Sequence, residues 1–355
     1  MSTENNQSKD DELQQQLGRS IKMLFSIAAV VFILFMILLN FDFFNSDNSS
    51  NAKKNSAKDI SKASEVELWE APDLESISDT AQKTLVLYGK ELIAHTSKYL
   101  GPKGSVLQIS NGLNCQNCHL DAGTRPWGNN YGSVASMYPK FRARSGSTEN
   151  IYKRVNDCFE RSLNGKSLDT LGREMQAIKS YIEFLGSNVE KGKKAEGSGF
   201  KDLAFMDRAA DPEKGKLVYE QKCLSCHQAD GQGTQLPDGS EYSFPPLWGK
   251  FSYNDGAGLY RITNFAKYVK YNMPLGATHD NTQLSNEEAW DVAAYVNSQP
   301  RPHINVPKDW PDISKKPIDH PFGPYADKFS QDQHKYGPWG PIAEERKKKE
   351  SKDKK

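Results

Sequence analysis

One five-residue pattern, Cys-x-x-Cys-His, occurs twice in this sequence. The first copy consists of Cys115, Cys118 and His119, and the second of Cys223, Cys226 and His227. Two thiols at this spacing can each form a thioether to a vinyl group of haem, and the next residue then places an imidazole on the iron. A zinc or redox Cys-x-x-Cys followed by a chance histidine is the alternative for one copy, and the second copy argues against it. The sequence therefore predicts two covalently bound haem c groups.

The second ligand of each iron decides whether that haem only carries electrons or also takes part in chemistry. For the second haem we predict Met273, which lies 46 residues after His227 in an Asn-Met-Pro sequence. Met206 and Lys270 are rival ligands, and a buried core methionine is the structural alternative. A His/Met iron suits electron exchange with a partner protein.

The first domain offers an unusual candidate, the fifth cysteine. Haem attachment uses four cysteines and leaves Cys158, a reactive thiol or ligand in an exported protein. A helix over residues 149–163 would place Arg154, Cys158 and Ser162 on one face, because they are four residues apart. A neighbouring arginine favours the thiolate. The alternatives are a small buried hydrophobic cysteine and an arginine whose stem lies along the surface.

Length and charge limit the class of protein. A chain of 355 residues allows two domains with additional segments. The formal net charge of +1 gives no support for a nucleic-acid partner. Basic residues gather at 53–62 and 346–355, and we interpret both runs as solvated segments.

An apolar stretch near the N-terminus has the length of a membrane span. Residues 21–39 contain one lysine and one serine among apolar side chains, and as a helix they would cover about 29 Å. We predict a transmembrane anchor at 21–41, a cytoplasmic segment at 1–20 and a flexible tether at 42–68, because the basic residues precede the apolar stretch. The catalytic part would then lie in the periplasm of a single-pass inner-membrane protein. A cleaved signal peptide is the alternative, although its apolar region is normally shorter.

The remaining chain divides into two similar halves and a tail. Helical spacing of apolar residues in 81–100 and 171–185 brackets a first domain at 69–190. A second domain is predicted at 200–299, and a wrapping tail with a basic end at 300–355. The fold class is therefore mainly α, with two fused cytochrome c-type domains.

Capping signals mark the two long helices expected in the second domain. Asp211 followed by Pro212 is typical of a helix start, and Ser285 with Glu288 forms a capping-box pattern before another apolar helix. The tail contains nine prolines between 300 and 341, which predicts little regular structure there. Its aromatic residues predict that it packs across both domains, with only the Lys-rich end free.

Several blocks of the chain resemble a known family. Residues 115–119, 138–146, 156–165, 272–276 and 320–342 are similar to the tetrathionate-forming thiosulfate dehydrogenases, which are dihaem enzymes of the periplasm. The resemblance covers about residues 75 to 342. The block around Cys158 is its most specific part.

The resemblance implies roles for individual residues. Cys158 would be the distal ligand of the first iron, opposite His119, and the chemistry would occur there. Arg144 and Arg154 would bind the substrate anions, and Ser162 would line the site. Relatives bind the second iron with His and either Met or Lys, and here an asparagine precedes Met273 where that lysine is expected, so Met273 is preferred.

The predicted function is the interconversion of two thiosulfates and one tetrathionate, in either direction. Electrons would pass from the Cys-ligated haem to the second haem and then to a soluble c-type cytochrome or another acceptor. Three alternatives remain. They are a non-catalytic dihaem electron carrier in a respiratory chain, an anchored docking protein, and an enzyme for a different sulfur substrate, such as the haem subunit of sulfur-oxidising multienzyme systems.

Overall fold

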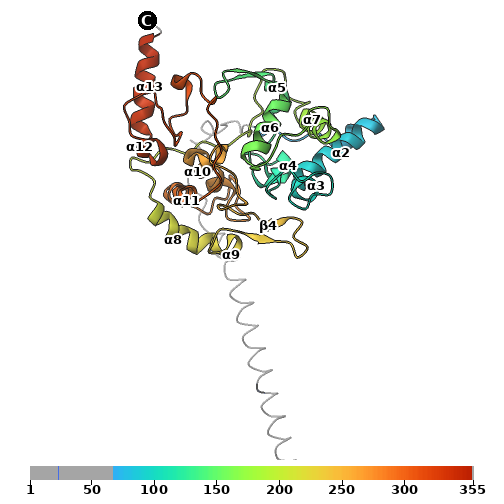
Figure 1. Ribbon diagram of the computed structural model, residues 1–355, viewed down its shortest axis with the longest axis horizontal. Helices are drawn as coiled ribbons and strands as arrows, with labels where there is room; N and C mark the ends of the chain where they lie inside the picture. Colours follow the sequence, from blue (N-terminus) through green and yellow to red (C-terminus); the bar gives the residue numbers. More distant parts are fainter. Residues whose placement is uncertain (1–22, 24–66, 354–355) are drawn as a thin grey trace, which may run out of the picture. The chain divides into compact units, whose positions relative to one another are not determined.

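The computed structural model describes Met23 and residues 67–353 (Figure 1). The predicted segments 1–20 and 21–41, and nearly all of the tether 42–68, lie outside the described residues. Among the residues that are described, no helix combines the length and the apolar character that crossing a membrane requires. The anchor therefore stays a prediction.

The first haem motif lies in a helical domain with one short hairpin. Its 3₁₀ turns are η1 (Leu74–Ser76) and η2 (Cys115–Asn117), and its antiparallel strands are β1 (Lys140–Arg142) and β2 (Ser147–Glu149). Its helices are α2 (Thr80–Ala94), α3 (Thr96–Leu100), α4 (Leu120–Gly123), α5 (Val134–Met137), α6 (Ile151–Arg161) and α7 (Arg173–Leu185). The continuous helix expected over 81–100 is interrupted at His95, whose backbone leaves the helical region.

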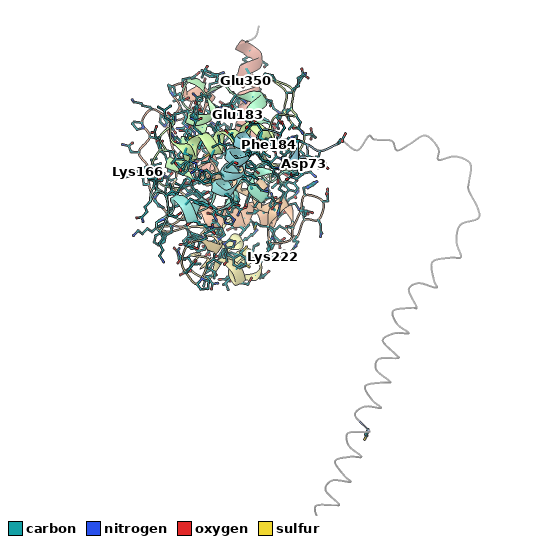
Figure 2. All side chains as sticks on the ribbon, turned by 90° about the vertical axis from the view of Figure 1, so that its right-hand side faces the viewer. Asp73, Lys166, Glu183, Phe184, Lys222 and Glu350 are labelled. Atoms are coloured by element: carbon teal, nitrogen blue, oxygen red, sulfur yellow. The ribbon has the colours of Figure 1, made fainter. Side chains whose placement is uncertain are left out.

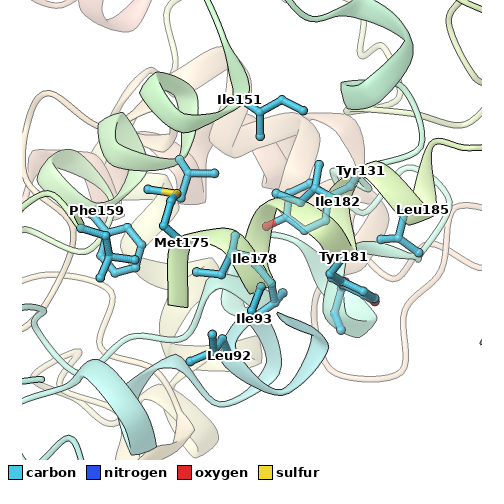
Figure 3. Packing of buried hydrophobic residues seen from close by; sticks show 14 of the residues in the cluster. Leu92, Ile93, Tyr131, Ile151, Phe159, Met175, Ile178, Tyr181, Ile182 and Leu185 are labelled. Carbon is cyan, nitrogen blue, oxygen red and sulfur yellow. The ribbon is translucent and has the colours of Figure 1, made fainter. Parts of the chain in front are cut away.

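Helices α2 and α7 cross closely and enclose the core of this domain. A glycine allows the approach: a Cβ on Gly89 would lie 2.6 Å from the carbonyl carbon of Ala177 and 2.8 Å from Cβ of Tyr181. Figure 3 shows the apolar side chains that fill the space beside this crossing. They include Leu92, Ile93, Met175, Ile178 and Ile182.

The second haem motif lies in a domain built in the same way. Its elements are α8 (Pro212–Lys222), α9 (Leu224–His227), β3 (Thr234–Gln235), β4 (Tyr242–Phe244), η3 (Gly258–Tyr260), α10 (Ile262–Asn272) and α11 (Asn286–Ser298). Strands β3 and β4 are antiparallel. The pair α8 and α11 repeats the close crossing, because a Cβ on Gly215 would lie 2.9 Å from Cβ of Tyr295. Lys222, labelled in Figure 2, lies at the end of α8. Its Nζ donates to Glu288 Oε1 of α11 over 2.7 Å.

The capping predictions for this domain are confirmed. The Asp211 side chain accepts from the backbone of the first turn of α8, with proline at the first helical position. Ser285 and Glu288 form both hydrogen bonds of a capping box at the start of α11.

The tail crosses both domains, as expected from its aromatic residues. Trp339 is fully buried in the core of the second domain, while Asp309 Oδ1 accepts from Arg161 Nη2 of α6 over 2.9 Å. The expectation of little regular structure is wrong at its end. After η4 (Ile313–Lys315) and α12 (Gln331–Tyr336), helix α13 (Gly340–Asp353) forms, because no proline follows position 341.

Hydrogen bonds join the two domains directly. Asn254 Nδ2 donates to the Glu160 carbonyl over 2.8 Å, and Tyr268 Oη donates to the Asn117 carbonyl over 2.7 Å. The β3–β4 hairpin also reaches the first domain, where Glu241 accepts from Asn114 Nδ2 over 3.0 Å. Residues next to the first haem motif therefore contact the second domain.

Candidate functional site

A cavity of about 290 Å³ in the first domain brings the predicted catalytic residues together. One part of its wall is the first haem motif, with Cys115, Cys118 and His119. Another part is the face of α6, with Arg154, Cys158 and Ser162. The spacing argument for α6 therefore leads to one shared cavity, and the leftover cysteine lies in the same cavity as the first haem motif.

The first motif is held in place by a capped turn. Asn114 forms a capping box with Asn117 at the start of η2, and the Asn114 Oδ1 accepts from the Ser97 backbone over 2.7 Å. His119 Nδ1 donates to the Asn129 carbonyl over 2.6 Å, which leaves Nε2 as the ligand atom. The His119 ring also stacks on Tyr131 with 4.4 Å between centroids.

The chemistry of these donors fits haem c. Burial lowers the pKa of His119 to about 4, so the imidazole is neutral, as an iron ligand must be. Burial also raises the pKa of the Cys115 and Cys118 thiols to about 12, so neither is a reactive thiolate. Cys115 and Cys118 would hold the macrocycle, and His119 would bind its iron.

Helix α6 presents a cation beside the free cysteine. Asn150 caps the helix by accepting from the Lys153 backbone over 2.9 Å, which fixes where the α6 face begins. The pKa of Arg154 is raised, chiefly by the negative charge available at Cys158 and against the effect of burial. Arg154 and Cys158 are thus close enough to interact electrostatically inside the cavity.

Arg144 lies elsewhere, among residues of the tail and the second domain. Its Nη1 donates to the Gly256 carbonyl over 3.2 Å, its Nε is 3.9 Å from Asp309 Oδ2, and its guanidinium lies 5.5 Å from the Trp310 ring. Burial and the nearby Arg161 lower its pKa to about 10. Arg144 is not part of the wall of the Cys158 cavity, so its role in anion binding stays a prediction.

Sequence reasoning missed four other residues of the cavity wall. These are Lys140 and Arg142 of β1, Met137 of α5, and Lys194 in the segment after α7. Lys194 lies more than fifty residues after the other three, so no local pattern relates it to them. The alternation of Lys140 and Arg142 on a short strand was the one available signal, since alternate strand residues share a face.

The second haem site has the same proximal arrangement. His227 Nδ1 donates to the Pro245 carbonyl over 2.8 Å, and burial lowers the pKa of His227. Met273 ends α10 and packs half-buried against the core of the second domain. The rival Lys270 is engaged elsewhere, because its Nζ lies 3.1 Å from Thr282 Oγ1 and also donates to a backbone carbonyl. Met206 packs against the same core, so the contacts alone leave both methionines as candidates.

Comparisons with known proteins agree with this arrangement. The family model described as "SoxA/TsdA, cytochrome c domain" matches residues 107–190, and the cytochrome c model matches residues 212–300. A thiosulfate dehydrogenase of Psychrobacter arcticus is 38% identical over 243 residues, which cover 68% of this chain and 71% of that protein. The chain belongs to the thiosulfate dehydrogenase family. With two cytochrome c domains it is a dihaem c-type cytochrome, which confirms the prediction from the repeated motif.

Other members of the thiosulfate dehydrogenase family show similar coverage. The thiosulfate dehydrogenase of Allochromatium vinosum is 38% identical over 223 residues, 61% of this chain and 81% of that protein. The solved structure of the thiosulfate dehydrogenase (TsdBA) from Marichromatium purpuratum superposes with a TM-score of 0.61 at 30% identity. That match covers 66% of this chain and half of the longer one.

Proposed function

We propose that the Cys158 cavity interconverts two thiosulfates and one tetrathionate. The observation that carries this proposal is that Cys158, Arg154 and Ser162 line one cavity with the first haem motif. Family membership supports the same reaction. Haem c would supply a one-electron acceptor at each of the two sites. Side chains would bind the anions and form and break the sulfur–sulfur bonds.

In the forward direction the Cys158 sulfur joins the terminal sulfur of one thiosulfate. This sulfur–sulfur bond leaves a thiosulfonate on Cys158 and releases two electrons, one for each haem. A second thiosulfate then attacks, through its terminal sulfur, the divalent sulfur that is bonded directly to the Cys158 sulfur. The new bond completes tetrathionate, and the bond to Cys158 breaks, so that its thiolate returns. No proton is consumed or released, and the reverse sequence reduces tetrathionate.

Arg154 can offset the repulsion between the two thiosulfate dianions that the reaction brings together. Two dianions 4 Å apart repel each other by about 4 kcal/mol even in water. A guanidinium binds sulfonate oxygens through paired, charge-assisted hydrogen bonds, so Arg154 can hold one anion beside Cys158. Ser162, four residues further along α6, can donate its hydroxyl to the same anion.

The decisive experiment compares two sulfur-containing side chains of one cavity. Cys158→Ala and Met137→Leu are prepared with both haems attached, and thiosulfate oxidation and tetrathionate reduction are measured. Cys158→Ala should lower both rates at least about 1000-fold, because it removes the group that forms the covalent bond. Met137→Leu is the matched control and should keep activity. Normal turnover by Cys158→Ala contradicts the mechanism, and loss of the resting ligand in Met137→Leu instead supports the electron-carrier alternative.

Cys223, Cys226, His227 and Met273 would hold the second haem, which would supply the exit for the electrons. Met273→Leu should remove the methionine-to-iron charge-transfer band and change the potential of that haem. Met206→Leu is the control, because this methionine also packs half-buried against the second core. Loss of the band in Met206→Leu instead assigns the ligand to Met206. An external c-type cytochrome would accept the electrons.

We assign residues 21–41 to a membrane anchor and the two domains to the periplasm. The apolar stretch and the preceding basic residues support this placement. The full chain should stay in the membrane fraction after alkaline washing, whereas a chain exported without residues 1–41 should be released. A full chain found in the released fraction with a shortened N-terminus indicates a cleaved signal instead.

A further inference from the structure

The wall of the Cys158 cavity is strongly one-sided in charge. Its charged lining residues are Lys140, Arg142, Arg154 and Lys194, and none of the described residues that line it is aspartate or glutamate. In the described part of the chain, Lys140, Arg142 and Lys194 form no ion pair. Three cations around one opening, none of them within ion-pair distance of an acid, are suited to an anionic ligand. Glu149 lies opposite Lys140 in the hairpin, and Lys194 acts on Asp202, which itself pairs with Lys267.

Two of these cations are more exposed than Arg154. Lys140 and Lys194 are exposed, whereas Arg142 and Arg154 are both half-buried, and Arg154 alone lies on α6 beside Cys158. The cavity therefore has an inner cation at the reacting sulfur and an outer group nearer to solvent. The buried Glu149, opposite Lys140 in the β1–β2 ladder, adds its charge to the surroundings of Arg154.

The segment that carries Lys194 is fixed in position. Ser136 Oγ donates to the Lys193 carbonyl over 2.7 Å, and the Ala195 backbone donates to Ser133 Oγ over 2.8 Å. Lys191 Nζ donates to the Ala135 carbonyl over 2.9 Å. Bonds on both sides of Lys194 thus hold the backbone of this segment against α5, which places Lys194 at the cavity wall.

We infer that Lys140, Arg142 and Lys194 form an outer anion subsite that holds the second thiosulfate, or the far sulfonate of tetrathionate. This inference rests on the proposed function. Tetrathionate is elongated with one sulfonate at each end, so a site for it needs cations at two depths. Arg154 supplies the inner one, and the outer group supplies the other while also drawing dianions toward the cavity.

The test measures binding separately from turnover. In Cys158→Ala holoprotein, which cannot form the covalent bond, the affinity for thiosulfate is measured by calorimetry with and without the substitutions K140Q, R142Q and K194Q. The triple substitution should weaken binding about tenfold or more at low ionic strength, and the difference should shrink at high salt. K194Q alone should show part of the effect, and K194R should restore it. K193Q is the matched control, because its exposed side chain lies outside the cavity wall.

Activity and potential separate the competing explanations. In the chain with Cys158 intact, the triple substitution should lower kcat/KM and flatten its dependence on salt, while the potential of the first haem stays unchanged. If the triple substitution leaves the thiosulfate affinity unchanged but shifts the potential of the first haem, the three cations pair with the haem propionates. That result overturns the proposed subsite. Absence of turnover in the unsubstituted enzyme is the failure of the proposed function itself, and the calorimetric comparison still decides the subsite.

Discussion

The substitution Gly89→Ala tests whether the α2–α7 crossing holds the first haem site together. The new Cβ would lie closest to the Ala177 carbonyl oxygen and 2.6 Å from its carbonyl carbon, whereas ordinary contact begins at 3.4 Å. The helices must therefore separate by more than about 0.8 Å, and a gap of this size forfeits at least a quarter to a half of each dispersion contact across it. Overpacking of this kind costs about 3 kcal/mol, and the better helix propensity of alanine returns about 1 kcal/mol. We expect a net loss of about 2 kcal/mol in the free energy of unfolding.

The same displacement should be visible at one haem and not at the other. Helix α2 contributes Ile93 to the Cys158 cavity, and α7 contributes Ile178 and Ile182. Urea unfolding of the holoprotein and the absorption of the two haems together give the assay. Gly89→Ala should alter the first haem, whereas Gly215→Ala, at the crossing of α8 and α11, should alter the second.

Gln82 lies on the same helix as Gly89 but faces solvent, so a substitution there serves as the control. Gln82→Ala lies on the exposed side of α2 and should leave stability within about 0.5 kcal/mol. If Gly89→Ala were as stable as the unsubstituted chain, with an unchanged first-haem spectrum, the crossing would not be the close contact described above.

Two further predictions concern buried charges of the tail. Asp309→Asn should lower the free energy of unfolding by about 3 kcal/mol, because it leaves the buried Arg161 without its counter-charge. Asp202→Asn, at a side chain that is 98% exposed, should change it by less than about 1 kcal/mol, and equal effects in urea titrations would contradict this. Burial and neighbouring cations, foremost Lys316, lower the pKa of His320 to about 4, so the unfolded chain binds its proton first on acidification. This contribution to stability is complete above pH 6.5 and is lost as pH falls toward 4, by at most about 3 kcal/mol. His320→Asn should therefore lose less stability than the unsubstituted chain between pH 7 and pH 4, and parallel losses would show that His320 does not titrate in this way.

Local patterns were sufficient for the parts of the site that lie on one element. The haem motifs and the common face of Arg154, Cys158 and Ser162 depend on spacings of two to four residues, which one turn of backbone determines. The caps at Asp211 and Ser285 are local in the same sense, because each side chain bonds to the backbone of the turn that follows it.

The remaining parts depend on contacts that no short segment specifies. Lys194 reaches the cavity because its segment bonds to α5, and no periodicity in residues 191–195 indicates that contact. The contacts of Arg144 are with Asp309 and Gly256, which are more than one hundred residues away in the chain, so no local pattern indicates them. The tail helix α13 was missed because the prolines before it dominated the composition of the whole segment.

The tail makes each haem domain dependent on the same C-terminal segment. Asp309 pairs with the first domain, and Trp339 completes the interior of the second, so each domain needs residues that follow both in the chain. We therefore expect that neither domain, produced alone, folds into a stable protein with one haem. During biosynthesis, the final closure of both halves must also wait until the chain has been made as far as Trp339.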